Sequence, residues 1–189
     1  MIFLGVKIDS LNLSQSLLKT REFLNSAGQY KIFTPNPEMI VKAQKDEYFK
    51  KVLNSGDLNL CDGFGLALAI NLSPSAREGV GGVGVNTSAT PPAPPLSKRR
   101  TRRISGVDFM VEVCKLAAER GRSVYLLGSG NDEVVKKTVE NLQVQFPDLK
   151  IVGYDKGPDI SENPACQFDG PIFEQISQSG AQILFVAFG

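Results

Sequence analysis

Short apolar runs alternate with helix-length amphipathic segments along most of the chain, as in folds built from β–α–β units. The apolar runs predict strands at residues 2–8, 30–34, 57–61, 123–127, 150–153 and 182–188. Between the strands, apolar residues recur every three or four positions. They predict helices at residues 10–24, 37–55 (in two parts), 66–72, 106–120, 132–146 and 172–179. The alternation predicts an α/β, Rossmann-like fold with a mainly parallel sheet flanked by helices.

Capping residues and glycines predict where several of these helices begin and end. Ser10 or Ser14 is expected to cap the first helix. Pro37 suits a first helical turn because it has no amide hydrogen to leave unpaired. Gly56 and Gly121 are placed as stop signals. The buried side of the first helix is expected to consist of leucines, namely Leu13, Leu17, Leu18 and Leu24.

The apolar period is lost between residues 73 and 101. This stretch holds four glycines within residues 79–84 and four prolines within residues 91–95, and it leads into a basic run at residues 98–103. Such a composition cannot form a packed core and is typical of linkers. We therefore expect a disordered, low-complexity insertion at 73–101 within a single domain of residues 1–189. That domain is expected to be incomplete at its C-terminus, because the chain ends directly after a predicted strand.

Composition excludes several classes of function. The chain of 189 residues has 21 Lys and Arg against 20 Asp and Glu, and its formal charge of +1 argues against a dedicated nucleic-acid-binding protein. The chain has no histidine, which excludes His-based triads and histidine zinc sites. Proton transfer near neutral pH therefore falls to a carboxylate, Lys, Tyr or Cys.

The cysteines and the apolar segments indicate a cytoplasmic protein. Three cysteines with no CxxC pair argue against a disulfide framework or a zinc cluster. Lys7 and Asp9 interrupt what would be the apolar part of a secretory signal. The longest apolar stretch, residues 63–72, is too short for a membrane span, which needs about 20 residues. Any work at a membrane is therefore expected to take place from outside it.

Three loops at the carboxyl ends of predicted strands carry candidate chemistry, at residues 34–37, 62–65 and 128–131. Parallel strands place these ends on one edge of the sheet, where ligands bind. Asp62 directly follows an apolar strand, and a partly desolvated carboxylate there can act as a general base. Thr34 and Asn36 offer a hydroxyl and an amide to a sugar or phosphate oxygen. For all three residues the alternative is a turn or a helix cap.

The third of these loops and the basic run could meet phosphates. Gly128, Ser129 and Gly130 can expose backbone amides at the start of a helix, although the GxGxxG spacing is incomplete. The basic run at 98–103 is more typical of a solvated linker. Arg103 differs from the rest of the run, because it adjoins a predicted helix start and can present a guanidinium fork to a diphosphate.

An ordered set of motifs resembles the WecG/TagA/CpsF glycosyltransferases, and the resemblance covers nearly the whole chain except the insertion. The motifs are GVKID at 5–9, TPNPE at 34–38, CDGFG at 61–65, RISGVD at 103–108, YLLGSG at 125–130 and IVGY at 151–154. The resemblance implies an inverting enzyme that moves N-acetylmannosamine, or a related sugar, from UDP to a polyprenyl-diphosphate-linked GlcNAc. It also implies a role in bacterial surface-polysaccharide or teichoic acid synthesis, with no metal or other cofactor.

The resemblance also implies roles for individual residues. Asp62 matches the proposed catalytic base, and Thr34 and Asn36 match polar residues of the same pocket. Arg103 matches an arginine that stabilises the departing diphosphate. The remaining matches are Gly106 and Asp108 around that arginine, Gly128, Ser129 and Gly130 along the nucleotide, and Tyr154 near the uracil.

The implied partners are a UDP-sugar donor, a lipid-linked sugar acceptor and the inner face of the cell membrane, with no nucleic acid. Two alternatives stay open. The first is a module of the same fold that binds nucleotide-sugar without transferring it, because the chain lacks the Gly-x-Pro-Lys-Gln-Glu segment with which the family continues. The second is a nucleic-acid-binding protein that uses the basic run. Assembly into a homo-oligomer is also expected, to cover apolar surface at the sheet edge.

Overall fold

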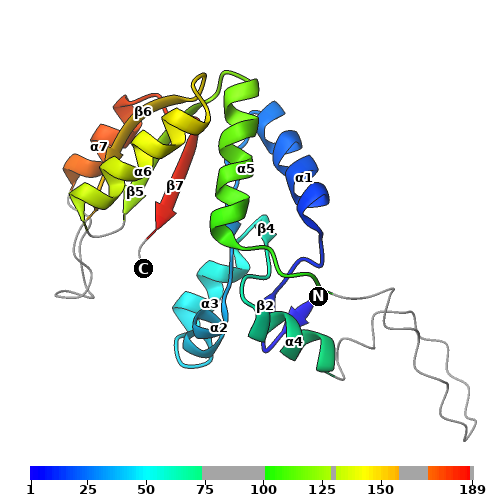
Figure 1. Cartoon of the computed structure of the whole chain (residues 1–189). Coiled ribbons are helices and arrows are strands. Elements are labelled where there is room, and N and C mark those ends of the chain that lie inside the picture. Colours follow the sequence, from blue (N-terminus) through cyan, green and yellow to red (C-terminus); the bar gives the residue numbers. More distant parts are fainter. Residues whose placement is uncertain (74–100, 129–130, 158–169, 188–189) are drawn as a thin grey trace, which may run out of the picture. The chain divides into compact units, whose positions relative to one another are not determined.

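The computed structural model describes residues 1–73, 101–128, 131–157 and 170–187, and the chain divides into two compact units, residues 1–109 and 110–189 (Figure 1). Both units combine helices with small sheets. Three of the four strand pairings in the described residues are parallel, and the pair nearest the N-terminus is antiparallel. The mixed α/β class predicted from the sequence is confirmed, and the small parallel sheets are compatible with a Rossmann-like fold.

In its described residues, 1–73 and 101–109, the first unit contains four short strands and four helices, and it ends in the first turn of a fifth helix. Its strands are β1 (Ile2–Phe3), β2 (Val6–Lys7), β3 (Ile32–Phe33) and β4 (Leu58–Asn59). Its helices are α1 (Leu13–Asn25), α2 (Pro37–Ala43), α3 (Glu47–Asn54), α4 (Phe64–Leu72) and the start of α5 (Gly106–Glu119). The predicted helix starts at Pro37 and Gly106 are confirmed.

The prediction of one continuous strand at residues 2–8 is wrong, because the chain reverses within it. β1 and β2 form an antiparallel hairpin in which Phe3 pairs with Val6. Leu4 and Gly5 make the turn with φ angles of 49° and 79°. Positive φ at both central residues is the geometry of a tight hairpin turn, which normally takes Asn-Gly. The leucine at the first position hid this turn in the sequence.

The first helix differs from its prediction at both its cap and its buried side. Asn12 caps α1 by accepting a hydrogen bond from the Gln15 backbone, and the Gln15 side chain returns one to the Asn12 backbone. The buried positions are Ser16 and Thr20, whereas Leu18 is exposed. Each buried hydroxyl donates to the backbone carbonyl four residues earlier, so small polar side chains face the interior with their hydrogen bonds satisfied.

Parallel strand pairing draws the loops of the first unit together. β3 pairs with β4, and the ladder continues beyond both strands, because the Leu60 N–H donates to Phe33 O and the Asp62 N–H to Pro35 O. On the other side, the Ile104 N–H donates to Cys61 O at 2.9 Å. The segments that follow β3, follow β4 and precede α5 are thus held side by side at one sheet edge.

Gly56 follows α3, but its backbone does not have the positive φ expected of a stop glycine. A Cβ atom on Gly56 would overlap the side chains of Asn59 and Phe33. Asn59 is fully buried, and its amide donates to the carbonyls of Lys7 and Leu53. Glycine is therefore required here for close packing rather than for backbone conformation.

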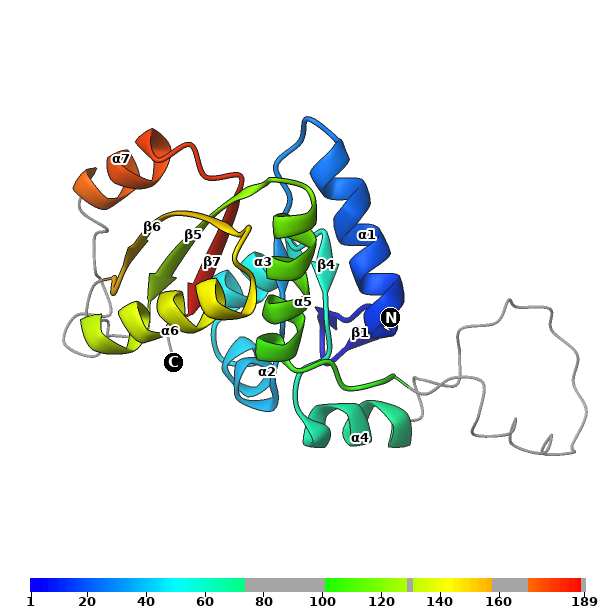
Figure 2. The same ribbon diagram turned by 45° about the horizontal axis from the view of Figure 1, so that its top comes forward.

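The second unit has a three-stranded parallel sheet in the order β6-β5-β7. The strands are β5 (Ser123–Gly128), β6 (Lys150–Asp155) and β7 (Ile183–Ala187), connected by α6 (Asp132–Gln145) and α7 (Gly170–Gln178). One face of the sheet packs with α5 and α6 around a cluster that includes Cys114, Val124, Leu126 and Val139. Figure 2 shows α7 on the opposite side of the strands from α6. Because β6 and β7 flank β5, the strand order reverses beside β5, the position at which α/β sheets place ligands.

Most of the predicted insertion, residues 74–100, lies outside the described residues. Its two borders are ordered parts of the first unit. Ser73 forms the C-terminal cap of α4, with its backbone N–H bonded to the carbonyls of Ala69 and Ile70. Thr101 is buried and exchanges two hydrogen bonds with the Asn71 side chain. Thr101, the last residue of the predicted insertion, is therefore packed against the end of α4.

Candidate active site

Asp62 lies at the carboxyl end of β4 and faces the start of α5. Its Oδ2 accepts a hydrogen bond from the Gly106 N–H at 3.1 Å, and its Oδ1 lies 3.9 Å from Nε of Arg103. The Asp62 side chain is 28% exposed and that of Arg103 is 55% exposed. The carboxylate is thus oriented by one backbone donor and paired with one cation, while part of it remains open to a ligand.

Gly106 also lies close to the hydroxyl of Thr34, a third polar group beside Asp62 and Arg103. A Cβ atom on Gly106 would lie 3.0 Å from Thr34 Oγ1 and 3.3 Å from Asp62 Oδ2. Such distances are tighter than ordinary packing, so the absence of a side chain lets the helix start approach both groups. The hydroxyl of Thr34 and the carboxylate of Asp62 therefore converge on the first residue of α5.

The structure shows which of Asn36 and Asp62 caps a helix. Asn36 is the N-cap of α2, because its Oδ1 accepts the Met39 N–H at 2.9 Å. Asp62 does not cap the helix that follows it, since Gly63 occupies the N-cap of α4 without a side-chain hydrogen bond. Instead Asp62 bonds a helix start 44 residues later in the chain. A residue that only formed a local turn would not need such a long-range hydrogen bond.

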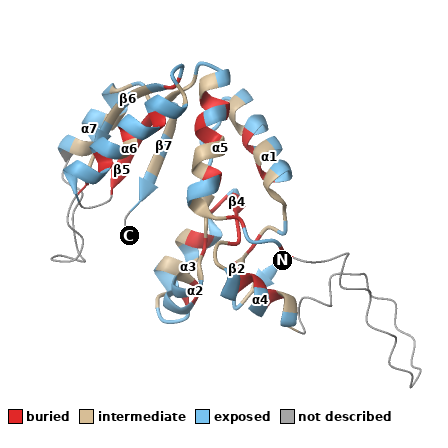
Figure 3. Cartoon of the chain, in the orientation of Figure 1, coloured by how far each residue is buried: buried red, intermediate tan, exposed pale blue. Residues whose placement is uncertain are grey.

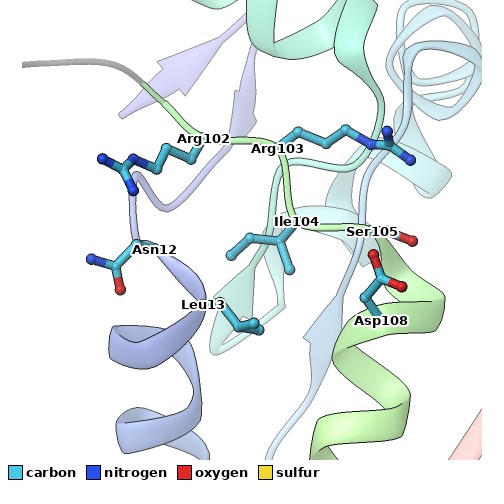
Figure 4. Close-up of a pocket in the computed structure, with 7 residues that line it drawn as sticks. All are labelled: Asn12, Leu13, Arg102, Arg103, Ile104, Ser105 and Asp108. Carbon is cyan, nitrogen blue, oxygen red and sulfur yellow. The ribbon is translucent and has the colours of Figure 1, made fainter.

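A surface pocket of about 260 Å³ opens beside this site, between the starts of α1 and α5. Figure 4 shows Ile104 and Leu13 as its apolar side, with Arg102 and Arg103 pointing in different directions. Its polar lining also includes Asn12, Ser105 and Asp108. From the sequence alone, Arg102 is expected in a solvated run, and Asn12 does not stand out as a candidate. The adjacent basic residues were visible in the sequence, but their proximity to the start of α1 was not.

Cys61, next to Asp62, is buried and free of disulfide bonds. Burial raises the pKa of its thiol to about 11, and the charge of Asp62 adds to this effect. This shift keeps the thiol protonated at neutral pH.

The other predicted nucleotide contacts belong to the second unit. Gly128 ends β5 with a φ of 108°, and a Cβ atom there would overlap the backbone carbonyl of Ala187. Asn131 caps α6 by accepting the Glu133 N–H at 2.8 Å. Tyr154 lies on β6 and is partly exposed. Ser129 and Gly130 lie outside the described residues.

The described residues contain no group of three or more Cys, Asp or Glu side chains placed to hold a metal ion. Within the same ranges, none of the helices is both long and apolar enough to cross a membrane.

The structure thus presents an α/β scaffold with a carboxylate, a hydroxyl and a guanidinium gathered at strand ends, an arrangement suited to sugar and phosphate chemistry. A family model described as Glycosyl transferase WecG/TagA/CpsF family matches residues 1–83 and 94–189, and the chain belongs to this family. The unmatched residues fall inside the predicted insertion. The resemblance inferred from the ordered motifs is confirmed.

Two curated relatives are both named N-acetylglucosaminyldiphosphoundecaprenol N-acetyl-beta-D-mannosaminyltransferase. The protein of Bacillus subtilis (strain 168) is 27% identical over 158 residues, which cover 84% of this chain and 50% of that protein. The protein of Staphylococcus aureus (strain NCTC 8325 / PS 47) is 23% identical over 188 residues, covering 98% of this chain and 62% of that protein. The chain therefore spans about half to three-fifths of the length of these relatives.

Proposed function

We propose that this protein is an inverting glycosyltransferase that moves N-acetylmannosamine, or a related sugar, from a UDP-sugar to a polyprenyl-diphosphate-linked GlcNAc. The product would serve bacterial surface-polysaccharide or teichoic acid synthesis. Family membership and the names of the relatives support the reaction class and the acceptor. The observation that carries the proposal is the carboxylate of Asp62, held between the Gly106 N–H and the Arg103 guanidinium.

In the proposed reaction, Asp62 takes the proton of the acceptor hydroxyl as that oxygen attacks the anomeric carbon of the donor sugar. The new glycosidic bond forms on the face opposite the departing UDP, which leaves with the electrons of the broken carbon–oxygen bond. Inversion requires one base on the acceptor side and positive charge on the leaving side. Asp62 supplies the base, and Arg103 supplies the charge.

The remaining predicted residues have supporting roles in this proposal. The Thr34 hydroxyl would hydrogen-bond a sugar oxygen, a role supported by its position beside Gly106 and Asp62. Because Gly106 has no side chain, the start of α5 approaches Thr34 and Asp62 closely. Asp108 lines the adjoining pocket. Asn36, whose oxygen caps α2, contributes through its remaining amide donors. Gly128, with Ser129 and Gly130, would lie along the nucleotide.

The test is the release of UDP from UDP-N-acetylmannosamine in the presence of a lipid-diphosphate-GlcNAc acceptor. Asp62→Asn keeps an oxygen for the Gly106 N–H but removes the base, so turnover is expected to fall about 10²–10⁴-fold with UDP binding retained. The matched control is Asp57→Asn at the opposite end of β4, where the carboxylate accepts the Lys31 N–H. An Asp62→Asn variant as active as the Asp57→Asn variant would remove the assignment.

A second candidate is a module that binds nucleotide-sugar without transferring it. The sequence left this alternative open, and no structural observation favours it over the transferase. Calorimetry with UDP, run beside the turnover assay, separates the two candidates. Binding with no turnover by the unaltered chain would favour the module.

A further inference from the structure

The pocket between the starts of α1 and α5 has two chemically different ends. An amide and a guanidinium line one end, a hydroxyl and a carboxylate line the other, and apolar side chains lie between them. In that order the residues are Asn12 and Arg102, Ser105 and Asp108, and Ile104 and Leu13 (Figure 4). We call the first the basic end and the second the acidic end. The pocket therefore changes from cationic to anionic along its length.

The acidic end adjoins the proposed base. Ser105 directly precedes Gly106, whose N–H donates to Asp62 at 3.1 Å. The two arginines of this segment point in different directions, and it is Arg103 that lies within 3.9 Å of the Asp62 carboxylate (Figure 4). Arg103 therefore serves the proposed catalytic centre, while Arg102 lies at the basic end of the pocket.

The segment that carries Arg102 is fixed on both sides of it. Thr101 is buried, and its hydroxyl shares a hydrogen bond of 3.1 Å with that of Ser10, two residues before the cap of α1. On the other side, Ile104 is buried and its N–H donates to Cys61 O. Figure 3 shows that this segment combines exposed with buried residues. An exposed arginine is thus held between two anchored neighbours, and the two walls of the pocket are joined.

The polar groups of the basic end are available to a ligand. Within the ranges that the structure describes, the Arg102 side chain makes no hydrogen bond or ion pair. Asn12 uses its backbone N–H and its Oδ1 in the capping box with Gln15, and neither bond involves Nδ2. A guanidinium fork matches the oxygens of a phosphate, and an amide adds a further donor. The basic end is therefore suited to a phosphate group.

We propose that this pocket binds the diphosphate of the lipid-linked acceptor, with Arg102 and Asn12 holding its oxygens. The proposal rests on the proposed function, in which the acceptor is a sugar joined to a diphosphate. With the sugar beside Asp62, its hydroxyls meet Ser105 and Asp108 at the acidic end. The diphosphate then lies at the basic end, away from the Asp108 carboxylate. The adjacent arginines thereby separate the two diphosphates of the reaction, because Arg103 serves the diphosphate of the donor.

The first test measures binding of inorganic pyrophosphate to the whole chain by calorimetry, with excess UDP present to occupy the proposed donor site. Arg102→Gln is expected to weaken this binding about five- to tenfold, through loss of charge-assisted hydrogen bonds. Asn12→Asp keeps a good helix cap but places a carboxylate at the basic end, so it is expected to weaken binding about three- to fivefold. Lys45→Gln, at an exposed position after α2, is the control and is expected to change nothing.

The second test asks whether the diphosphate is that of the acceptor. A short-chain prenyl-diphosphate-GlcNAc is expected to displace pyrophosphate from the unaltered chain. In steady-state turnover, Arg102→Gln is expected to raise the KM for the acceptor about five- to tenfold, with less than about a twofold change in kcat and in the KM for the donor. Arg102→Lys is expected to recover part of the loss, because it keeps the charge but not the guanidinium fork.

The outcomes separate this inference from the proposed function. Pyrophosphate that does not bind in the presence of UDP, or that binds equally well to Arg102→Gln and Lys45→Gln, would overturn the pocket as a phosphate site. Binding that depends on Arg102 but resists the acceptor analogue would identify a site for free phosphate and overturn the acceptor assignment. Calorimetry and displacement need no turnover, so they decide the inference even if the transferase assay fails. Thermal unfolding of each variant verifies that it remains folded.

Discussion

The backbone N–H of Gly106 donates to Oδ2 of Asp62 at 3.1 Å, which joins the start of α5 to the end of β4 across 44 residues of sequence. The same glycine leaves room for Thr34 Oγ1, which would lie 3.0 Å from a Cβ at that position. Two polar groups from different loops are therefore positioned by a residue that has no side chain. The candidate site depends on this close approach as much as on its charged residues.

Gly106→Ala is expected to reduce turnover about three- to tenfold, because the added Cβ must displace Thr34 or Asp62 by a few tenths of an ångström. The free energy of unfolding is expected to change by less than about 1 kcal/mol, since alanine favours the helix. Steady-state UDP release and urea unfolding measure the two effects. Gly65→Ala is the control, because its Cβ would meet Pro37 at an ordinary 3.8 Å. Equal turnover in the two variants would contradict the packing argument.

The buried thiol of Cys61 is expected to make folding stability fall in alkaline solution. Its pKa rises from 9.0 to about 11 on folding, through burial first and the charge of Asp62 second. Below pH 9 the thiol is protonated in both states. Between pH 9 and about 11 the unfolded chain releases this proton while the folded chain keeps it, so the free energy of unfolding decreases. Urea unfolding from pH 8 to about 11 should show a shallower decrease in Cys61→Ala than in the unaltered chain.

Removal of the neighbouring charge gives an independent check of the same coupling. Asp62→Asn is expected to lower the pKa of Cys61 and to speed its alkylation by iodoacetamide near pH 10. The measurement uses a Cys166→Ser background, so that Cys61 and Cys114 are the remaining thiols. Cys114 serves as the internal control, because burial alone raises its pKa to about 12. An unchanged Cys61 rate would show that the Asp62 charge does not act on the thiol.

The hairpin turn near the N-terminus offers a stabilising substitution. Leu4 has a φ of 49°, a conformation that costs a leucine roughly 1–2 kcal/mol and that asparagine adopts more readily. Leu4→Asn creates the preferred Asn-Gly pair and is expected to raise the free energy of unfolding by about 0.5–1 kcal/mol. Leu4→Ala is the control, since it removes the exposed side chain but keeps the unfavourable backbone. A gain of equal size in Leu4→Ala would assign the effect to the lost apolar surface.

Gly128→Ala is expected to destabilise the second unit by about 2–4 kcal/mol, because the new methyl would overlap the carbonyl of Ala187 in addition to the cost of positive φ. Gly180→Ala isolates the backbone cost. Its φ is 66°, but no atom lies within 4 Å of the added Cβ, so about 1 kcal/mol is expected. Chemical unfolding of both variants gives the difference. Equal losses would show that β5 and β7 separate at this end without cost.

Apart from the hairpin within residues 2–7, the sequence by itself determined the order of helices and strands. It also determined the helix starts at Pro37 and Gly106 and the polar loops at the strand ends. These features depend on local periodicity and on residues a few positions apart, which a single chain displays directly. The ordered motifs also determined the family. Asp62, Thr34 and Arg103 could be selected because polar residues directly after apolar strands, or beside a helix start, stand out from the surrounding pattern.

Only the tertiary structure decided which groups meet and which faces are covered. The hydrogen bond from Gly106 to Asp62, the burial of Ser16 and Thr20 in place of Leu18, and the exposure of Phe64 all depend on segments distant in sequence. Local patterns specify that a helix has an apolar face, but they do not specify what packs against it. That choice follows from the shape and the hydrogen-bonding needs of the whole unit, because burial is favourable only where every polar group finds a partner.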